Sequence, residues 1–275
     1  MPTFSAPDGV RLAYRVHGDG APLVCVPGGP ADSRYLGDLG GLPAHRRLIV
    51  LDLRGTGRSA LPGDVSSYRC DRLAEDVEAL RVHLGLPVID LLGHSAGTDI
   101  VTQYAARHPG NVGRLVLVAP GGRSLGITVS ARSRRELALL RAHEPWFPAA
   151  FAALEAVLEG TGSDWAAVDP FFCGRWDGPA RRHRAASRPD NAQALAQFAA
   201  GDAFTPGATR AALAALAAPV LLLAGELDLN SPPGTVAEAA GLFPRGRLSV
   251  QPGAGHCPWT DDADRFASAV AAFLA

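Results

Sequence analysis

The sequence predicts an α/β fold, in which a doubly wound, mostly parallel eight-stranded sheet carries an inserted helical cap. Short Leu-rich or β-branched runs alternate with helical patterns, and this alternation places helices on both faces of a parallel sheet. The alternation stops at about residue 122 and resumes after residue 205. We therefore expect residues 1–121 and 206–275 to form one core and residues 122–205 to form the cap.

The strands of the first half are short runs, the first alternating and the others apolar, and each leads into a turn that contains Gly, Pro or Asp. The runs are Val10–Val16, Pro22–Val26, Arg47–Leu51, Val88–Leu92 and Val112–Val118. The first follows an Asp-Gly turn, so we expect an antiparallel hairpin there. Helices are expected at Tyr68–Leu84, where apolar residues recur every three or four positions, and at Thr98–Arg107, before a Pro-Gly pair.

The middle stretch is rich in Arg, Ala and aromatic residues and has no apolar strand run. Its helices are expected near Ser133–His143, Ala149–Leu158 and Pro179–Ala186. Strands resume at Val220–Leu223 and Arg247–Gln251, and a final helix is expected over residues 262–274.

Composition excludes several classes of function. The chain has 275 residues, a net charge of -1 and 47% hydrophobic residues, so a globular core is expected and nucleic acid is not an expected partner. Every basic residue is Arg, which excludes a Schiff-base lysine, a P-loop lysine and a Ser–Lys dyad. The four cysteines form no CxxC pair, and we expect neither a metal nor a cofactor.

The N-terminus lacks a basic and an apolar signal region, and no apolar run is long enough to span a membrane. We therefore expect a cytoplasmic protein that acts on a small-molecule substrate without membrane association. Its oligomeric state stays open.

The segment Gly93-His94-Ser95-Ala96-Gly97 matches G-x-S-x-G, the pattern of a nucleophile elbow. It lies directly after an apolar strand run and directly before a helical pattern, as this turn requires. We expect Ser95 to be the nucleophile, with its hydroxyl at the N-terminus of the helix. His94 is interpreted as a packing residue.

The partners of such a serine follow in the chain order acid, then histidine. Asp228 follows the strand Val220–Leu223, with Glu226 as the weaker alternative, and His256 follows the strand Arg247–Gln251. His256 would accept the serine proton, and Asp228 would orient the imidazole. Asp52 precedes the nucleophile, so an ion pair with Arg54 or Arg58 is the expected role.

Two backbone N–H groups are needed to bind an oxyanion. Ala96, directly after the nucleophile, would supply one. Gly29, in the loop after the strand Pro22–Val26, would supply the other.

These segments resemble the α/β-hydrolase superfamily, and within it the proline iminopeptidase-like branch. Pro27-Gly28-Gly29-Pro30-Ala31 is similar to that branch's H-G-G-P-G segment, and the run from Asp52 to Ser59 is similar to its D-x-R-G-x-G-x-S loop. The resemblance implies a Ser-His-Asp hydrolase with a helical lid. True proline iminopeptidases usually carry Gly before the serine and an aromatic residue after it, whereas this chain has His94 and Ala96.

The expected function is therefore a serine hydrolase that forms an acyl-enzyme with a small, largely apolar ester, lactone or amide. Alternatives are a proline iminopeptidase-type aminopeptidase, a C–C hydrolase, lyase or perhydrolase, and a non-catalytic ligand-binding protein. Aromatic cap residues and the cysteine after the base are expected to line the pocket: Trp146, Phe147, Phe171, Phe172, Trp176 and Cys257. An aminopeptidase would need an anchor for a protonated amine, for which the candidates are Glu144 and Asp177.

Overall fold

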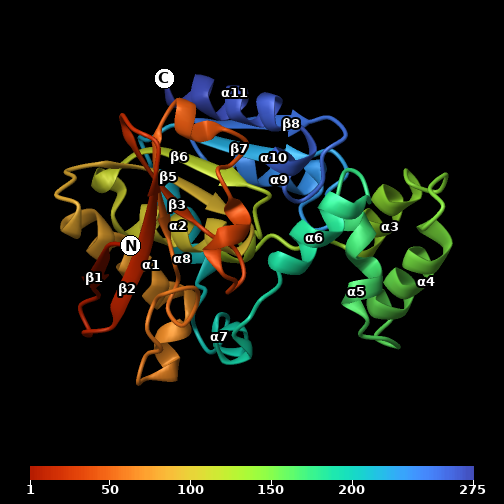
Figure 1. Ribbon diagram of the computed structural model, residues 1–275, viewed down its shortest axis with the longest axis horizontal. Helices are drawn as coiled ribbons and strands as arrows, with labels where there is room; N and C mark the ends of the chain where they lie inside the picture. The colour runs from red at the N-terminus through yellow and green to blue at the C-terminus, as the bar shows by residue number, and fades with distance from the viewer.

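A computed structural model describes residues 1–275 and shows one eight-stranded sheet with helices on both faces (Figure 1). The strand order is β1-β2-β4-β3-β5-β6-β7-β8. The strands are β1 Thr3–Ser5, β2 Arg11–His17, β3 Pro22–Val26, β4 Arg47–Leu51, β5 Ile89–His94, β6 Val112–Val118, β7 Val220–Gly225 and β8 Gly246–Gln251. The pairs β1–β2 and β2–β4 are antiparallel and the other five pairs are parallel, so the predicted doubly wound, mostly parallel sheet is confirmed.

The expected helices are present with small shifts at their ends, and several short ones were not predicted. The helices are α1 Cys70–His83, α2 Ala96–Arg107, α3 Ala131–Leu139, α4 Phe147–Leu158, α5 Trp165–Val168, α6 Gly178–Ala186, α7 Ala192–Gln197, α8 Pro206–Leu213, α9 Pro233–Ala240, α10 Pro258–Asp261 and α11 Ala263–Leu274. Two of the 3-10 turns contribute to the site, η1 Ser33–Leu36 and η6 Asp169–Phe172. No helix combines the length and the apolar character needed to cross a bilayer.

Alternate side chains of each central strand enter two separate apolar layers. In β3, Val24 and Val26 join the layer formed with α1, α2, α8 and α9, whereas Leu23 and Cys25 face the layer formed with α11 and η1. All four are fully buried. This burial on both faces explains why the central strands are continuous apolar runs without polar alternation.

The segment between β6 and β7 contains α3 to α8. In Figure 1 the helices α3, α4 and α5 lie beside the sheet, away from both chain termini. These helices share a small apolar cluster with η6 and the loop after β7, which includes Leu154, Phe171 and Leu229. We refer to residues 122–205 as the cap segment.

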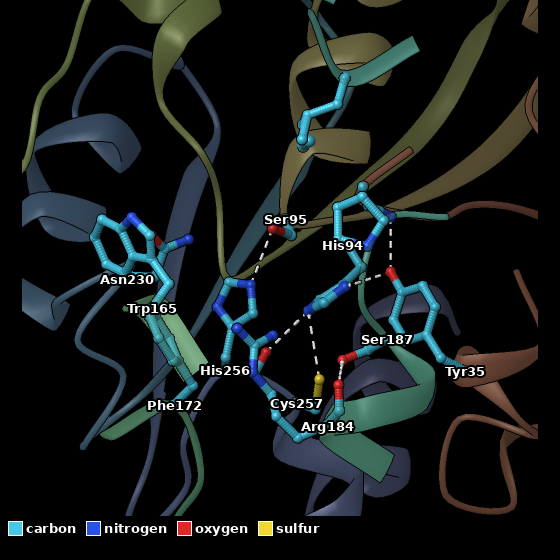
Figure 2. A pocket seen from close by; sticks show the side chains of 15 residues that line it. Tyr35, His94, Ser95, Trp165, Phe172, Arg184, Ser187, Asn230, His256 and Cys257 are labelled. Atoms are coloured by element: carbon cyan, nitrogen blue, oxygen red, sulfur yellow. Dashed lines mark hydrogen bonds between the residues drawn. The ribbon is translucent and has the colours of Figure 1, made fainter. Parts of the chain in front are cut away.

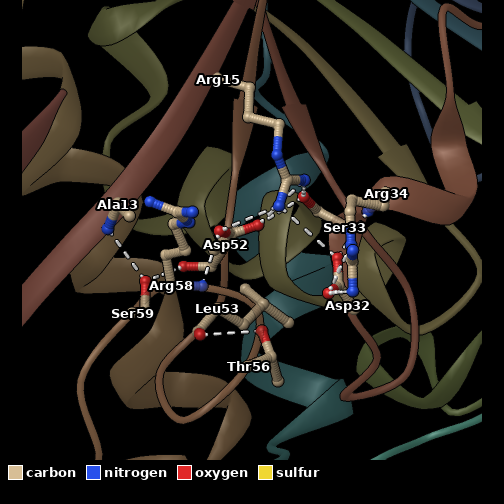
Figure 3. Close-up of polar contacts among 10 residues, drawn as sticks. All are labelled: Ala13, Arg15, Asp32, Ser33, Arg34, Asp52, Leu53, Thr56, Arg58 and Ser59. Carbon is tan, nitrogen blue, oxygen red and sulfur yellow. Dashed lines mark hydrogen bonds and ion pairs between the residues drawn. The ribbon is translucent and has the colours of Figure 1, made fainter. Parts of the chain in front are cut away.

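The loop after β4 folds around the buried carboxylate of Asp52 (Figure 3). That carboxylate accepts from the Ser33 hydroxyl at 2.5 Å and from the Arg58 backbone N–H at 2.9 Å. It lies 3.3 Å from the Arg15 guanidinium. The predicted side-chain pair with Arg54 or Arg58 is therefore wrong.

Arg54 instead pairs with Asp76 on α1, through contacts of 2.7 and 2.6 Å. The shape of the loop around Asp52 depends on one glycine. Gly57 has a φ of 53°, and a Cβ there would lie 2.5 Å from the Asp52 carboxyl group. The loop thus turns tightly over Asp52, while the buried Arg54 side chain reaches Asp76 on the helix.

Candidate active site

Ser95 occupies a strained turn between β5 and α2. Its φ is 53° and its ψ is −124°, a conformation that is rare for residues other than glycine. A Cβ on Gly93 would lie 2.7 Å from the Gly97 carbonyl oxygen, and a Cβ on Gly97 would lie 2.4 Å from the carbonyl oxygens of β3 and Pro27. Both flanking positions must therefore lack a side chain, as the elbow pattern predicts.

Ser95, His256 and Asp228 form one hydrogen-bonded chain. His256 Nε2 lies 2.9 Å from Ser95 Oγ, and His256 Nδ1 lies 2.8 Å from Asp228 Oδ2 (Figure 2 shows the serine contact). Asp228 is fully buried. Because a carboxylate only accepts, Nδ1–H donates to Asp228, and Nε2 is left to accept the serine proton.

Asp228 and His256 come from the loops after β7 and β8, which are neighbouring strands. Close backbone contact aligns these loops, since a Cβ on Gly225 would lie 2.1 Å from the Gly255 carbonyl oxygen. The alternative acid, Glu226, accepts from the Gly253 N–H at 2.7 Å and makes no contact with His256. The structure thus brings Asp228, rather than Glu226, to the histidine.

Two backbone N–H groups beside Ser95 make no hydrogen bond within the chain. They belong to Gly29, whose φ is 116°, and to Ala96, the first residue of α2. The loop before Gly29 approaches the serine closely, because a Cβ on Gly28 would lie 2.8 Å from Ser95 Cβ. This geometry agrees with the predicted oxyanion-binding pair.

His94 links three loops of the site instead of only packing. The Gly28 N–H donates to the Tyr35 hydroxyl at 2.6 Å, and that hydroxyl donates to His94 Nδ1 at 2.7 Å (Figure 2). His94 Nε2–H then donates to the His256 carbonyl oxygen at 2.9 Å. Burial, together with the neighbouring His256, holds the pKa of His94 well below its usual value, so the ring is neutral.

Two cavities meet at Ser95. The first, which we name the aromatic chamber, has a volume of about 380 Å³ and is lined by Gly28, Gly29, Tyr35, His94, Ser95, Ala96, Trp165, Phe172, Arg184, Ser187, Pro189, Leu195, Asn230, His256 and Cys257 (Figure 2). The second, the arginine chamber, has a volume of about 320 Å³ and is lined by Gly29, Ser95, Ala96, Asp99, Gly121, Arg123, Ile127, Thr128, Val129, Arg134, Leu195, Phe198 and Asn230. The serine and both candidate oxyanion donors line both chambers.

Of the predicted pocket residues, Phe172 and Cys257 line the aromatic chamber. Trp146, Phe147 and Phe171 instead pack on one another inside the cap segment, with Phe171 at ring distances of 5.0 and 6.0 Å from the other two. Trp176 lies 5.3 Å from the Arg181 guanidinium and lines neither chamber. These four assignments are wrong: Trp146, Phe147 and Phe171 pack in the small apolar cluster of the cap segment, and Trp176 packs against Arg181.

The residues that the sequence did not indicate come from separate elements, among them Tyr35, Trp165, Leu195 and Asn230. No spacing in the sequence connects them. A signal existed only for Tyr35, which lies shortly after the glycine-rich loop.

Neither predicted amine anchor lies at the site. Glu144 pairs with Arg141 at 3.0 Å, and Asp177 accepts from the Ala180 N–H at 2.9 Å at the start of α6. Both carboxylates are thus engaged within the cap segment, and neither lines a chamber. No group of three or more His, Cys, Asp or Glu side chains is arranged to hold a metal ion.

Comparison with known proteins assigns the fold to a family. The family described as alpha/beta hydrolase fold matches residues 21–263. The chain belongs to this family. The sequence is 31% identical to N-formylmaleamate deformylase of Pseudomonas putida, over 97% of this chain and 94% of that one.

The predicted likeness to proline iminopeptidases is also confirmed for this α/β hydrolase. It is 34% identical to the proline iminopeptidase of Heyndrickxia coagulans, over 38% of this chain and 36% of that relative's length. An esterase structure from Thermogutta terrifontis superposes with a TM-score of 0.74 at 26% identity, covering 99% of this chain and 97% of that one. The proteins to which this chain is similar therefore include an esterase, a deformylase and a proline iminopeptidase.

Proposed function

We propose that this α/β hydrolase is a serine hydrolase that acts on a small, largely apolar ester, lactone or amide through an acyl-enzyme intermediate. The observation that carries the proposal is the continuous hydrogen-bonded chain from Ser95 through His256 to the buried Asp228. The similarity to a deformylase and to an esterase supports both amides and esters as substrates.

In the acylation step, Ser95 Oγ attacks the substrate carbonyl carbon while its proton passes to His256 Nε2. The carbonyl oxygen gains negative charge, and the N–H groups of Gly29 and Ala96 donate to it. His256 then gives the proton to the leaving alcohol or amine as the bond to the carbonyl carbon breaks. Asp228 stabilises the imidazolium that exists between these transfers.

Deacylation repeats the sequence with water. His256 takes a proton from a water molecule, whose oxygen attacks the ester carbon of the acyl-enzyme. The proton then returns to Ser95 Oγ, and the free acid leaves. A loss of one oxyanion donor typically costs about a hundredfold or more in kcat.

The chambers favour this assignment over an aminopeptidase. Asp99 is the acidic residue among the lining side chains, and its Oδ1 accepts from both the backbone N–H and the hydroxyl of Ser124, at 2.8 and 2.6 Å. Arginines line both chambers, and positive charge disfavours a protonated amine.

A fluorophosphonate probe tests the proposal. We expect the wild-type protein to be labelled and Ser95→Ala to remain unlabelled while still folded, as judged by circular dichroism. A folded wild-type protein that resists labelling would overturn the Ser95 mechanism and favour a non-catalytic ligand-binding role.

Substrate panels then separate the enzyme classes. We expect turnover of p-nitrophenyl esters of short apolar acids in preference to proline p-nitroanilide. Turnover of the proline amide but not of the esters would instead establish the aminopeptidase alternative. Labelling without turnover of either would direct attention to C–C hydrolysis, lyase or perhydrolase chemistry.

A further inference from the structure

Arg134, on α3, lines the arginine chamber together with Ser95 and both oxyanion donors. Its side chain is half-buried and makes neither a hydrogen bond nor an ion pair with any group of the chain. Burial lowers the pKa of Arg134, and the acidic group that opposes this effect is Asp228. A guanidinium carries donors in a planar fork, so leaving it unpaired in a cavity is costly.

The other arginines of α3 to α6 are satisfied or exposed. Arg132 pairs with Glu136 at 2.7 Å, and Arg135 pairs with Glu155 at 2.8 Å, both beside Arg134 on the same helix. Arg184, which lines the aromatic chamber, pairs with Asp169 at 2.8 Å. Only Arg134 thus combines burial, an opening onto the nucleophile and donors without acceptors.

A second positive charge lies at the edge of the same chamber. Arg123 is exposed there, and the one carboxylate of the lining, Asp99, is held by Ser124 and adjoins Arg123. The remaining polar groups of the lining include Thr128 and Asn230, which carry no charge. The free charge that faces the chamber is therefore cationic.

From this arrangement we infer that Arg134 binds a carboxylate of the substrate, and that the preferred substrates are acidic esters, amides or lactones. The carboxylate lies on the part of the molecule that enters the arginine chamber, while the apolar part enters the aromatic chamber. The inference rests on the proposed function and narrows its substrate class. A guanidinium and a carboxylate form paired, charge-assisted hydrogen bonds that a neutral ester does not offer.

The test compares matched ester pairs. Mono-p-nitrophenyl adipate and p-nitrophenyl hexanoate share an acyl chain length and differ in a terminal carboxylate. Phenyl butyrate and its p-carboxyphenyl analogue place the same difference on the leaving group. We expect the wild-type enzyme to prefer the acidic member of one pair.

Arg134→Gln should lower the acidic-to-neutral ratio of kcat/KM by about tenfold to a hundredfold, because a charged hydrogen bond is lost. Most of that change should appear in KM. Arg134→Lys, which keeps the charge, should retain part of the preference. Arg132→Gln removes the same charge from an exposed site on α3 and should keep the wild-type ratio.

Two results would overturn the inference: an unchanged ratio in Arg134→Gln, or an equal fall in Arg132→Gln. A direct binding measurement separates this outcome from failure of the hydrolase proposal. Adipate has no ester bond that the enzyme could hydrolyse, so calorimetry reports its binding alone. We expect adipate to bind the wild-type protein and Arg132→Gln but not Arg134→Gln. If no ester is hydrolysed and adipate still binds through Arg134, the carboxylate site stands and the proposed function falls.

Discussion

Gly97 lies where the elbow packs against the end of β3 and the loop that follows it. The carbonyl oxygens of Val26 and Pro27 occupy the space that a side chain at this position would need. A Cβ on Gly28 would likewise lie 2.8 Å from Ser95 Cβ, so the loop that carries Gly29 packs directly against the elbow that carries Ala96. The position of the two candidate oxyanion donors therefore depends on the lack of a side chain at Gly97.

Gly97→Ala should destabilise the fold by about 1–3 kcal/mol or more, since the added carbon meets backbone atoms that have no rotamer to change. Hydrolysis of p-nitrophenyl esters should fall as well, because the loop that carries Gly29 must move away. Urea denaturation and initial rates measure both effects. Gly110→Ala is the control, because nothing lies within 4 Å of a Cβ at that position; equal losses in both variants would refute the argument.

At this scale the sequence predicted those residues whose chemistry depends on local backbone geometry. The strand, the two glycines and the helix around Ser95 indicate this residue, and the position of His256 after a strand, in a glycine-rich loop, indicates His256. Trp165 and Asn230 could not be predicted, because long-range packing alone brings them to the chambers. The same kind of packing places Trp146 and Phe147 against Phe171 and away from the chambers.

Among the elements, the contact between η6 and the loop after β8 holds His256 in place. The His256 N–H donates to the Phe172 carbonyl oxygen at 2.8 Å. Asp261 on α10 accepts from the Gly255 N–H at 2.8 Å and from the Gly174 N–H at 3.2 Å. The cap segment and the base loop are therefore joined through one carboxylate and one peptide.

Asp261→Ala should free two amides, raise their hydrogen-exchange rates and lower kcat/KM by about tenfold, since a small misplacement of a catalytic group is costly. Exchange at Gly174, Gly255 and His256, measured by NMR, reports the loosening directly. Asp264→Ala, at an exposed position in α11, should leave exchange at these amides as in the wild type. Unaltered exchange in Asp261→Ala would show that Asp261 does not join the two segments.

The strands β2 to β8 and the long helices agree with the sequence prediction to within a few residues, because burial on one or two faces imposes a clear period, whereas the three-residue β1 was not predicted. The helices α5 and α7 were not predicted either, since each is too short for a period to show. Their starts are set by side-chain caps, Asp164 and Asn191, which accept from the backbone three residues later.

The stability of the whole molecule depends on pH through histidines that folding keeps neutral. His94 is buried, and burial also lowers the pKa of His183. An unfolded histidine has a pKa near about 6.5. Below that pH the unfolded chain binds protons that the folded chain does not, so the free energy of unfolding falls as the pH falls.

His94→Gln should reduce this dependence. Between pH 7.5 and pH 5.5 the wild type should lose more stability than the variant by up to about 1.4 kcal/mol, which corresponds to one proton over about one pH unit. Urea titrations at several pH values measure the slope. His45→Gln, at an exposed position, should show the same dependence of stability on pH as the wild type. If His94→Gln also shows the wild-type dependence, the His94 ring of the wild-type protein is protonated in the folded state over this pH range.

The chain leaves the sheet for the cap segment after β6 and returns to it at β7, and these two strands are hydrogen-bonded neighbours. An insertion between adjacent strands can lengthen, shorten or be exchanged without altering the order of the others. Arg134, Trp165 and Phe172 all belong to it, whereas Ser95, Asp228 and His256 do not. Natural variation or engineering can thus exchange the residues that line the chambers without moving Ser95, Asp228 and His256 to other elements, provided that the contacts of Phe172 and Gly174 with the loop after β8 are kept.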